Sequence, residues 1–474
     1  MSDGLPNEQS VFEHRKLKDL YEEVRDVYLR YPQPWVIGYS GGKDSTTVLQ
    51  LVWKALEKLK SKDKQKPVFV IASDTKVETP VIVNHIDTTL HLVNEKAKAT
   101  GMPFHAEKVM PTLNNSFWIN LIGRGYPAPT TRFRWCTERL KIDPANRFIE
   151  EKVTQYGEVI MILGVRKMES STRMQLMNTY QVKDHLLRRH SSLPGAYVYA
   201  PIADFSTKDV WNYLLQNSPS SWGSNNRDLV TLYRNANAGE CPLVIDDTTP
   251  SCGSSRFGCW VCTVAQRDSS MEALVDNGED WLEPLLRFRD YLAETIDPER
   301  KREYRDIKGR DGRIIINKAG TAAVARTYKF EASKDMLERL LRAQQSVRLN
   351  GPNPKETLIS EEELHEIRRL WRTERQDWED SLPKIFRKVN GYDLEWPIDD
   401  DAGFDTDQKA LLAGICNEYE VPFDLVAKML EAERRSIGMT RRAGIQKSLD
   451  SVLSQEWRSE DEILVEENNK RRLF

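Results

Sequence analysis

The sequence predicts an α/β protein: a parallel sheet, then a Cys-rich segment, then a helical C-terminal region. Up to Leu215, short apolar segments alternate with amphipathic helical ones, as in parallel sheets covered on both faces. Four cysteines then crowd between Cys241 and Cys262, and charged, helically periodic sequence fills the chain beyond residue 320. We therefore expect three domains, at residues 1–235, 236–325 and 326–474.

Composition indicates a soluble protein with ample length for a large core. Hydrophobic residues make up 39% and charged residues 30% of the 474 positions, and no apolar run approaches the roughly 20 residues of a membrane helix. The first residues lack a basic-then-apolar signal, so we expect a cytoplasmic protein without a membrane partner. The net charge of −3 neither demands nor forbids nucleic acid, so a polyanion would need a local basic patch. Six cysteines in so long a chain do not indicate a disulfide framework.

The elements follow one another in regular order. Residues 10–31 carry apolar side chains at helical spacing, and Ser360 with Glu363 predicts a capping box ahead of a C-terminal helix. Residues 216–256 are rich in Ser, Asn, Gly and Pro and show no periodicity, so we expect an ordered or ligand-bound excursion there rather than an element of the sheet. The predicted strands are 35–39, 68–72, 102–106, 159–163 and 198–202, and helices are predicted from Thr46, over 79–100, over 207–215 and within 405–455.

The first predicted strand runs into the hexapeptide Ser40-Gly41-Gly42-Lys43-Asp44-Ser45, and a helix follows. Glycines let backbone N–H groups approach phosphate oxygens, and the helix dipole adds positive potential. The serine hydroxyls are further donors and Lys43 is a mobile cation. The segment is not a Walker A loop, because Gly38 is one residue too close to Gly42 and Asp44 follows Lys43. The alternative is an ordinary glycine turn between strand and helix.

Ser73, Asp74 and Thr75 follow the second predicted strand. In a parallel sheet this position lies beside the loop that follows the first strand. The Asp74 carboxylate could therefore hold Mg²⁺ on nucleotide phosphates, or a ribose hydroxyl. A turn or helix cap is an equally good interpretation.

Two basic segments come next. Six Lys or Arg lie between Arg124 and Arg147 with Phe and Trp interleaved, a composition that can grip a phosphate chain, although a solvated helix face has the same composition. Gly164 follows the fourth strand, and Arg166 and Arg173 could clamp a phosphate between them. Ion pairing with Glu169 is the alternative.

The Cys-rich segment has the spacing Cys241-x10-Cys252-x6-Cys259-x2-Cys262. Four soft ligands of this kind suit a tetrahedral zinc ion or an iron–sulfur cluster, and spacing alone does not separate the two.

Several of these motifs resemble those of known families, in the same order. The hexapeptide is similar to the pyrophosphate loop of N-type ATP pyrophosphatases, and its strand–loop–helix domain to the adenine nucleotide α-hydrolase-like (PP-loop) fold. Together with Ser-Asp-Thr, the segment from Cys136 to Pro144, the Gly164–Arg173 motif and the run Pro201–Trp211, it resembles the phosphoadenosine-phosphosulfate reductase superfamily over residues 34–215. Two features depart from reductases: no Cys follows Cys416, and a single Cys stands at position 136 where cluster-bearing reductases have a pair.

With the Cys-rich segment and the helical extension, the chain is most similar to the sulfurtransferases of DNA phosphorothioation, the C component of Dnd systems. That resemblance implies ATP-dependent adenylation of a DNA backbone phosphate with release of pyrophosphate, followed by replacement of a non-bridging oxygen by sulfur. The implied partners are DNA, a cysteine desulfurase as sulfur donor and other phosphorothioation proteins. The implied cofactors are Mg²⁺ and a [4Fe-4S] cluster on Cys241, Cys252, Cys259 and Cys262.

We expect ATP at Ser40–Ser45, with Ser73–Thr75, Gly164 and Arg166 also contributing to its site. The catalytic candidates are Lys43, Asp44, Cys136, Arg166 and Arg173. Cys136 could relay sulfur if the neighbouring positive charges lower the pKa of its thiol.

Two other functions remain open. The same loop chemistry would serve a tRNA thiolase or a reductase of sulfate nucleotides. In a different class, a zinc-knuckle scaffold could use the loop only to sense nucleotide.

Overall fold

The computed structural model describes residues 10–167, 186–235, 258–397, 406–434 and 444–472. The chain forms two compact units: unit 1 holds residues 1–112 and 132–286, and unit 2 holds residues 113–131 and 287–474. None of the helices in these ranges is long and apolar enough to cross a membrane.

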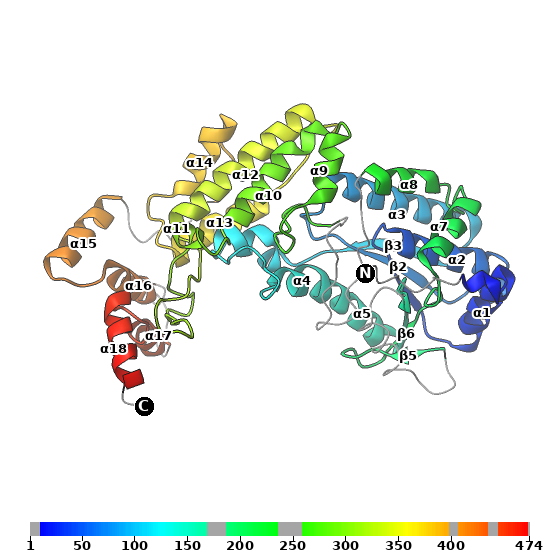
Figure 1. The fold of residues 1–474 in the computed structure, drawn as a ribbon, viewed down its shortest axis with the longest axis horizontal. Coiled ribbons are helices and arrows are strands. Elements are labelled where there is room, and N and C mark those ends of the chain that lie inside the picture. The colour runs from blue at the N-terminus through cyan, green and yellow to red at the C-terminus, as the bar shows by residue number, and fades with distance from the viewer. Residues whose placement is uncertain (1–9, 168–185, 236–257, 398–405, 435–443, 473–474) are drawn as a thin grey trace, which may run out of the picture. The chain divides into compact units, whose positions relative to one another are not determined.

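Unit 1 is built on a mostly parallel sheet in the order β3-β2-β1-β4-β6-β5, which confirms the predicted α/β fold (Figure 1). Only the pairing of β5 with β6 is antiparallel among these strands. In register, Trp35 lies opposite Val68 and Ile160. The strands are β1 (Trp35–Gly38), β2 (Val68–Ser73), β3 (Phe104–Val109), β4 (Val159–Ile162), β5 (Arg188–Arg189) and β6 (Ala196–Tyr199).

Helices cover both faces of this sheet because successive side chains of a strand point to opposite faces. On one face, Val36 packs in a core cluster with Phe148. On the other face, its neighbour on β1, Trp35, meets Tyr28 edge to face, with the ring centres 5.2 Å apart. The helices of unit 1 are α1 (Leu17–Arg30), α2 (Lys43–Glu57), α3 (Pro80–Thr100), α4 (Trp135–Thr137), α5 (Asp143–Tyr156), α7 (Thr207–Gln216), α8 (Asn226–Asn235) and α9 (Ser269–Asp276). α1 and α7 pack on α2, and α5 packs on β2, β3 and β4.

Unit 2 is helical in its described part, and its central helices pack through buried tryptophans. The Trp371 indole donates to the carbonyl of Ile122 at 3.0 Å, and the Trp118 indole donates to the carbonyl of Leu358 at 2.6 Å. The predicted capping box is confirmed: Ser360 and Glu363 exchange hydrogen bonds of 3.2 and 2.9 Å. Its helices are α11 (Lys301–Tyr304), α12 (Phe330–Asn350), α13 (Glu361–Glu374), α14 (Ser381–Asn390), α15 (Thr406–Glu418), α16 (Phe423–Arg434), α17 (Ile445–Leu453) and α18 (Glu460–Arg472); α10 (Glu283–Glu294) spans the boundary between the units.

The structure corrects three sequence predictions. Residues 216–256 were interpreted as an excursion without periodicity, but the helix α8 (Asn226–Asn235) forms within them, with Asn226 and Leu229 buried on one of its faces. β6 spans Ala196–Tyr199, so its start and its end both come earlier than those of the predicted strand 198–202. It ends early because the chain turns at Pro201, which has no N–H to donate to a ladder. β3 begins at Phe104 and extends to Val109, rather than covering 102–106.

Candidate nucleotide site

The loop after β1 forms a concave turn lined by backbone. Gly41 has φ +75°, and a Cβ atom on it would lie 2.9 Å from Cγ1 of Ile86, so both the conformation and the space require glycine. Gly42 caps α2 in an extended conformation, and the helix begins at Lys43. The first N–H groups of a helix have no partner within it, so this end of α2 can bind an anion.

Hydroxyl groups hold the loop in shape. Ser45 Oγ accepts from the Ser40 amide at 3.2 Å and donates to the Gly42 carbonyl at 3.0 Å. The Thr46 hydroxyl donates to the same carbonyl at 2.9 Å. These bonds satisfy the Gly42 carbonyl just before α2.

A chain of three charged side chains lies beside the loop. Lys43 Nζ is 3.1 Å from Asp44 Oδ2, and Arg166 Nε is 2.8 Å from Asp44 Oδ1. Lys43 and Arg166 are each 2% exposed. Two cations therefore share one carboxylate, and the group as a whole carries one positive charge for an incoming phosphate.

The structure places Arg166 differently from a surface clamp. Besides Asp44, its guanidinium donates to the Thr207 hydroxyl at 3.2 Å. The segment after β4 also touches the loop directly, because a Cβ on Gly164 would lie 2.9 Å from the carbonyl carbon of Asp44. Gly164 is thus a point of close backbone approach, and Arg173 lies outside the described residues.

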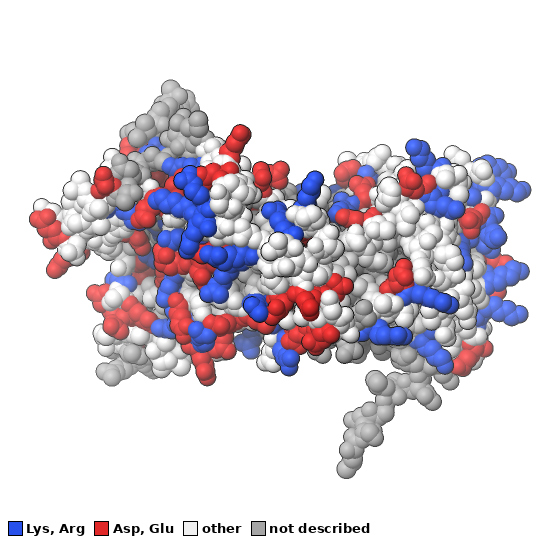
Figure 2. All heavy atoms as spheres, turned by 90° about the horizontal axis from the view of Figure 1, so that it is seen from above, with Lys and Arg blue, Asp and Glu red and all other residues white. Residues whose placement is uncertain are grey.

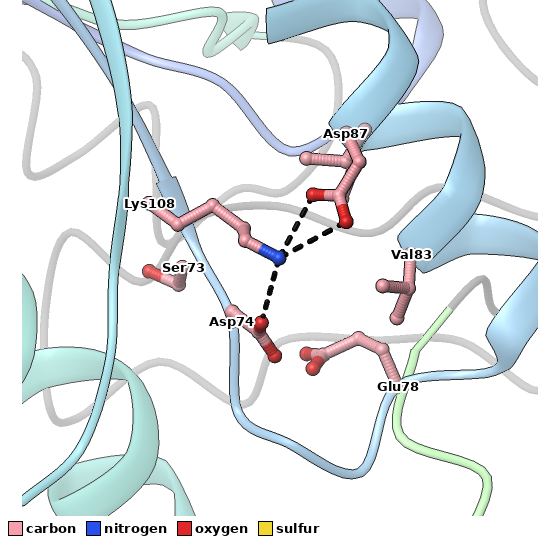
Figure 3. A pocket seen from close by; sticks show the side chains of 7 residues that line it. Ser73, Asp74, Glu78, Val83, Asp87 and Lys108 are labelled. Atoms are coloured by element: carbon pink, nitrogen blue, oxygen red, sulfur yellow. Dashed lines mark hydrogen bonds and ion pairs between the residues drawn. The ribbon is translucent and has the colours of Figure 1, made fainter. Parts of the chain in front are cut away.

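Asp74 follows β2, as expected, and lies in a charged pocket (Figure 3). Lys108 Nζ lies 3.0 Å from Asp74 Oδ2 and 2.8 Å from Asp87 Oδ1. The backbone N–H of Lys76 donates to Asp74 Oδ1 at 2.9 Å. Burial opposes the charge on Lys108, but the ion pairs with Asp87 and Asp74 outweigh it and raise its pKa. The pocket is lined by Ser73, Asp74, Glu78, Val83, Ile86, Asp87 and Lys108, and it meets the loop at Ile86.

The segment with Cys259 and Cys262 docks on the turn that follows Asp74. The Trp260 amide donates to the carbonyl of Val77 at 2.9 Å, and the indole itself is 1% exposed. Cys259 Sγ lies 3.4 Å from the Thr75 hydroxyl and 3.8 Å from Glu78 Oε1. The Cys262 amide donates to the Cys259 carbonyl at 3.1 Å, which closes a tight turn between the two cysteines.

Cys136 shares this environment. Burial raises the pKa of the Cys136 thiol to about 11; the charge of Cys262 adds to the shift, while Lys141 opposes it. Burial likewise raises the pKa of Cys259 well above its ordinary value, with Lys141 again opposing. The condition set for a relay by Cys136, a pKa lowered by neighbouring positive charge, is not met, because desolvation outweighs the effect of Lys141. Burial thus disfavours the thiolate form of Cys136 and of Cys259.

Two of the four proposed cluster ligands, Cys241 and Cys252, lie outside the described residues. Among the residues that the structure describes, no three His, Cys, Asp or Glu side chains are arranged to hold a metal ion. The basic segment is divided between the units: Arg124 belongs to unit 2, and residues 132–147 belong to unit 1. Figure 2 shows acidic and basic side chains intermixed over much of one face, in keeping with the net charge of −3.

Sequence reasoning did not identify Tyr233 or Lys108 as residues of this region. Tyr233 accepts a hydrogen bond from the Lys43 amide at 3.0 Å, yet it lies in the segment that was expected to be irregular. Lys108 ends up beside Asp74 because β3 pairs with β2 in a register that sets it opposite Ala72. No pattern in the sequence signals either contact.

The fold and the site define a class: parallel α/β proteins with a glycine-rich anion loop between the first strand and its helix. Residues 34–265 match the family described as phosphoadenosine phosphosulfate reductase domain. Residues 407–454 match a family described as a small protein found in certain Dnd DNA modification systems. The chain therefore carries a reductase-like domain followed by a segment similar to a Dnd-system protein.

Individual relatives match parts of the chain. An uncharacterized protein of Methanocaldococcus jannaschii is 28% identical over 193 residues, which is 41% of this chain and 34% of that protein. The chain thus matches about a third of that relative's length. A phosphate complex of the Candida auris phosphoadenylyl-sulfate reductase is 17% identical, with a TM-score of 0.27 over 47% of this chain and 94% of that one. The U34-tRNA thiolase of Methanococcus maripaludis with its [4Fe-4S] cluster is 13% identical, with a TM-score of 0.28 over 59% and 80%.

Proposed function

We propose that this chain is an ATP-dependent sulfurtransferase that adenylates a DNA backbone phosphate and helps to replace one of its non-bridging oxygens with sulfur. The observation that carries the proposal is the combination, in one chain, of a match to the phosphosulfate reductase domain and a match to a Dnd-system small protein. The glycine-rich loop at the start of α2 and the Cys259 thiol near Thr75 and Glu78 support the proposal. DNA as substrate is supported by the Dnd-system match.

In the first step, a non-bridging oxygen of the DNA phosphate attacks the α-phosphorus of ATP. The bond from that phosphorus to the bridging oxygen breaks, and pyrophosphate leaves. The loop amides and Lys43 would face the charge that grows on the leaving phosphates, and they are already held in place by Ser45 and Asp44. An unreactive phosphate oxygen thereby becomes part of AMP, a far better leaving group.

In the second step, the outer sulfur of a persulfide attacks the DNA phosphorus, and AMP leaves with the activated oxygen. A thiol then cleaves the sulfur–sulfur bond, which leaves phosphorothioate on the DNA and a disulfide on the donor side. We propose a cysteine desulfurase as the source of the persulfide and Cys136 as its carrier in this chain. Because burial raises the pKa of Cys136, loading would require a neighbouring cation such as Lys141 to stabilise the thiolate.

The proposed [4Fe-4S] cluster would be held by Cys241, Cys252, Cys259 and Cys262. The described pair fits this role, since both thiols lie on one tight turn that is anchored by a buried tryptophan. When bound, such a cluster would accept electrons or bind sulfur, and its cysteine ligands would be thiolates.

Mg²⁺ is proposed at Asp74, where it would neutralise charge on the phosphates of ATP. Both carboxylate oxygens of Asp74 already have partners, one of them Lys108. A metal ion there requires Lys108 to turn wholly to Asp87, which it already contacts at 2.8 Å.

The test is pyrophosphate release by protein purified without oxygen and supplied with Mg²⁺ and ATP. We expect release that depends on duplex DNA, that disappears in Lys43→Ala and that persists in Lys58→Ala, which alters an exposed lysine at the other end of α2. Digestion of cellular DNA and mass spectrometry should then detect phosphorothioate dinucleotides only when Lys43 is intact. Release that depends on tRNA and not on DNA would instead indicate a tRNA thiolase, and no turnover with any nucleic acid would indicate a scaffold.

A further inference from the structure

A tyrosine hydroxyl lies on the anion loop. Tyr233, in the last turn of α8, accepts the hydrogen bond of the Lys43 amide at 3.0 Å. Lys43 is the first residue of α2, so this amide is among the donors that a helix leaves unsatisfied at its N-terminus. The oxygen of Tyr233 therefore sits where an oxygen of a bound phosphate would accept.

The space around Gly42 supports the same conclusion. A Cβ atom on Gly42 would lie 3.0 Å from the Tyr233 hydroxyl oxygen. The room that this glycine leaves for a ligand is thus filled by the phenol. Lys43 Nζ lies 5.6 Å from the centre of the Tyr233 ring, close enough for the ring face to attract the cation.

Contacts with the neighbouring helices hold Tyr233 in this place. Its ring meets that of Trp211 on α7 edge to face, with centres 5.1 Å apart. At the start of α8, the buried Asn226 amide donates to Gln50 Oε1 on α2 at 3.1 Å and to the Leu214 carbonyl at 2.8 Å. The helix is therefore fixed to α2 and α7 at its start and places the tyrosine over the loop at its end.

We propose that Tyr233 competes with the nucleotide for the phosphate loop: its hydroxyl takes the Lys43 amide in the free protein, and ATP displaces it. The inference rests on the proposed function, since it assumes that ATP binds this loop. One N–H makes one strong hydrogen bond, so a phosphate oxygen gains this donor only when the phenol releases it. The hydrogen bond from the Lys43 amide to Tyr233 thus weakens the binding of ATP. It favours ligands with enough negative charge to displace the tyrosine hydroxyl.

Calorimetric titration of ATP and of inorganic pyrophosphate into wild type and Tyr233→Phe tests the proposal. Phenylalanine keeps the ring against Trp211 and removes the competing oxygen. We expect both ligands to bind about two- to tenfold more tightly, the effect of one net hydrogen bond. The matched control is Tyr197→Phe, which removes a hydroxyl bonded to Glu158 at the opposite end of the sheet and should leave both affinities unchanged.

The outcomes separate the two proposals. Equal or weaker binding of ATP to Tyr233→Phe would overturn the competition, and so would a similar gain for adenosine, which has no phosphate. Failure of ATP to bind wild type and both variants would overturn the nucleotide site itself, and the competition with it.

Hydrogen exchange gives a second readout that needs no ligand. In the nucleotide-free protein, the amide of Lys43 is protected by its bond to Tyr233. Exchange at the start of α2 should therefore be faster in Tyr233→Phe than in wild type, and slow in both once ATP is bound. An unchanged exchange rate in the free variant would show that the phenol does not hold this amide in solution.

Discussion

Gly164→Ala should distort the loop after β1 by pressing on the backbone at the start of α2. An added Cβ would lie 2.9 Å from the Asp44 carbonyl carbon, 3.0 Å from its oxygen and 3.0 Å from the Ser45 amide nitrogen. Carbon atoms in proteins rest about 3.5–4.0 Å apart, so the methyl group overlaps the Asp44 carbonyl carbon by roughly half an ångström or more. The Asp44 oxygen and the Ser45 nitrogen must each give way by a few tenths of an ångström. All three belong to the backbone at the start of α2, and no side chain can rotate away to relieve the overlap.

We expect Gly164→Ala to lower the free energy of unfolding by about 1–3 kcal/mol, the usual cost of inserting a methyl group into a packed site. The start of α2 must also shift away from the end of β4, so the affinity for ATP should fall in parallel. Urea unfolding and calorimetric titration measure the two effects separately.

Gly414→Ala provides a matched control, because a Cβ there meets nothing within 4 Å and the position lies inside α15. The same substitution should there raise stability by about 0.5–1 kcal/mol, since alanine favours a helix over glycine. If Gly164→Ala is as stable as wild type and binds ATP equally well, the close approach of β4 to the loop is not a constraint on the site.

Further substitutions probe other residues of unit 1. Arg166→Met should lower the free energy of unfolding in urea by about 3–5 kcal/mol, because it removes the buried cation that pairs with the Asp44 carboxylate. Adding Asp44→Asn should restore part of the loss. If it restores nothing, the unpaired carboxylate is not the cause of the loss. Burial lowers the pKa of Lys66 to about 7, below that of a lysine in the unfolded chain. Above pH 7 the unfolded chain therefore binds more protons than the folded one, and the free energy of unfolding should rise with pH up to about 10. Lys66→Met should flatten that rise, and an unchanged slope would exclude Lys66 as its source. Cys262→Ser should remove iron and visible absorbance from protein purified without oxygen, whereas Cys136→Ser should keep both and block sulfur incorporation in cells; full incorporation would exclude the relay.

The tyrosine at the loop illustrates what the sequence could not predict. Pattern reasoning treated residues 216–256 as irregular because Ser and Asn dominate them. Those residues are compatible with α8 because Asn226 is buried and bonded to α2 and α7, a compensation that appears only when the helices pack. Helix packing therefore brought Tyr233 to Lys43 across 190 positions.

The thiols show the same limit in their chemistry. Basic residues around Cys136 suggested a lowered pKa, since charge is visible in a sequence. Burial is not visible there, and it proves the larger effect, raising the pKa of that thiol to about 11. The proximity of Cys136 to Cys262 likewise depends on how the segment with Cys259 and Cys262 docks on the turn after β2.

By itself the sequence determined the parallel α/β fold, the capping box at Ser360 and the place of the loop between strand and helix. These depend on local periodicity, glycine conformation and helix capping, all of which act over a few residues. Only the tertiary structure decided which charges meet: Arg166 with Asp44, and Lys108 with Asp74. The physical reason is that strand register and helix packing fix these distances, and both are set by contacts between segments far apart in the chain.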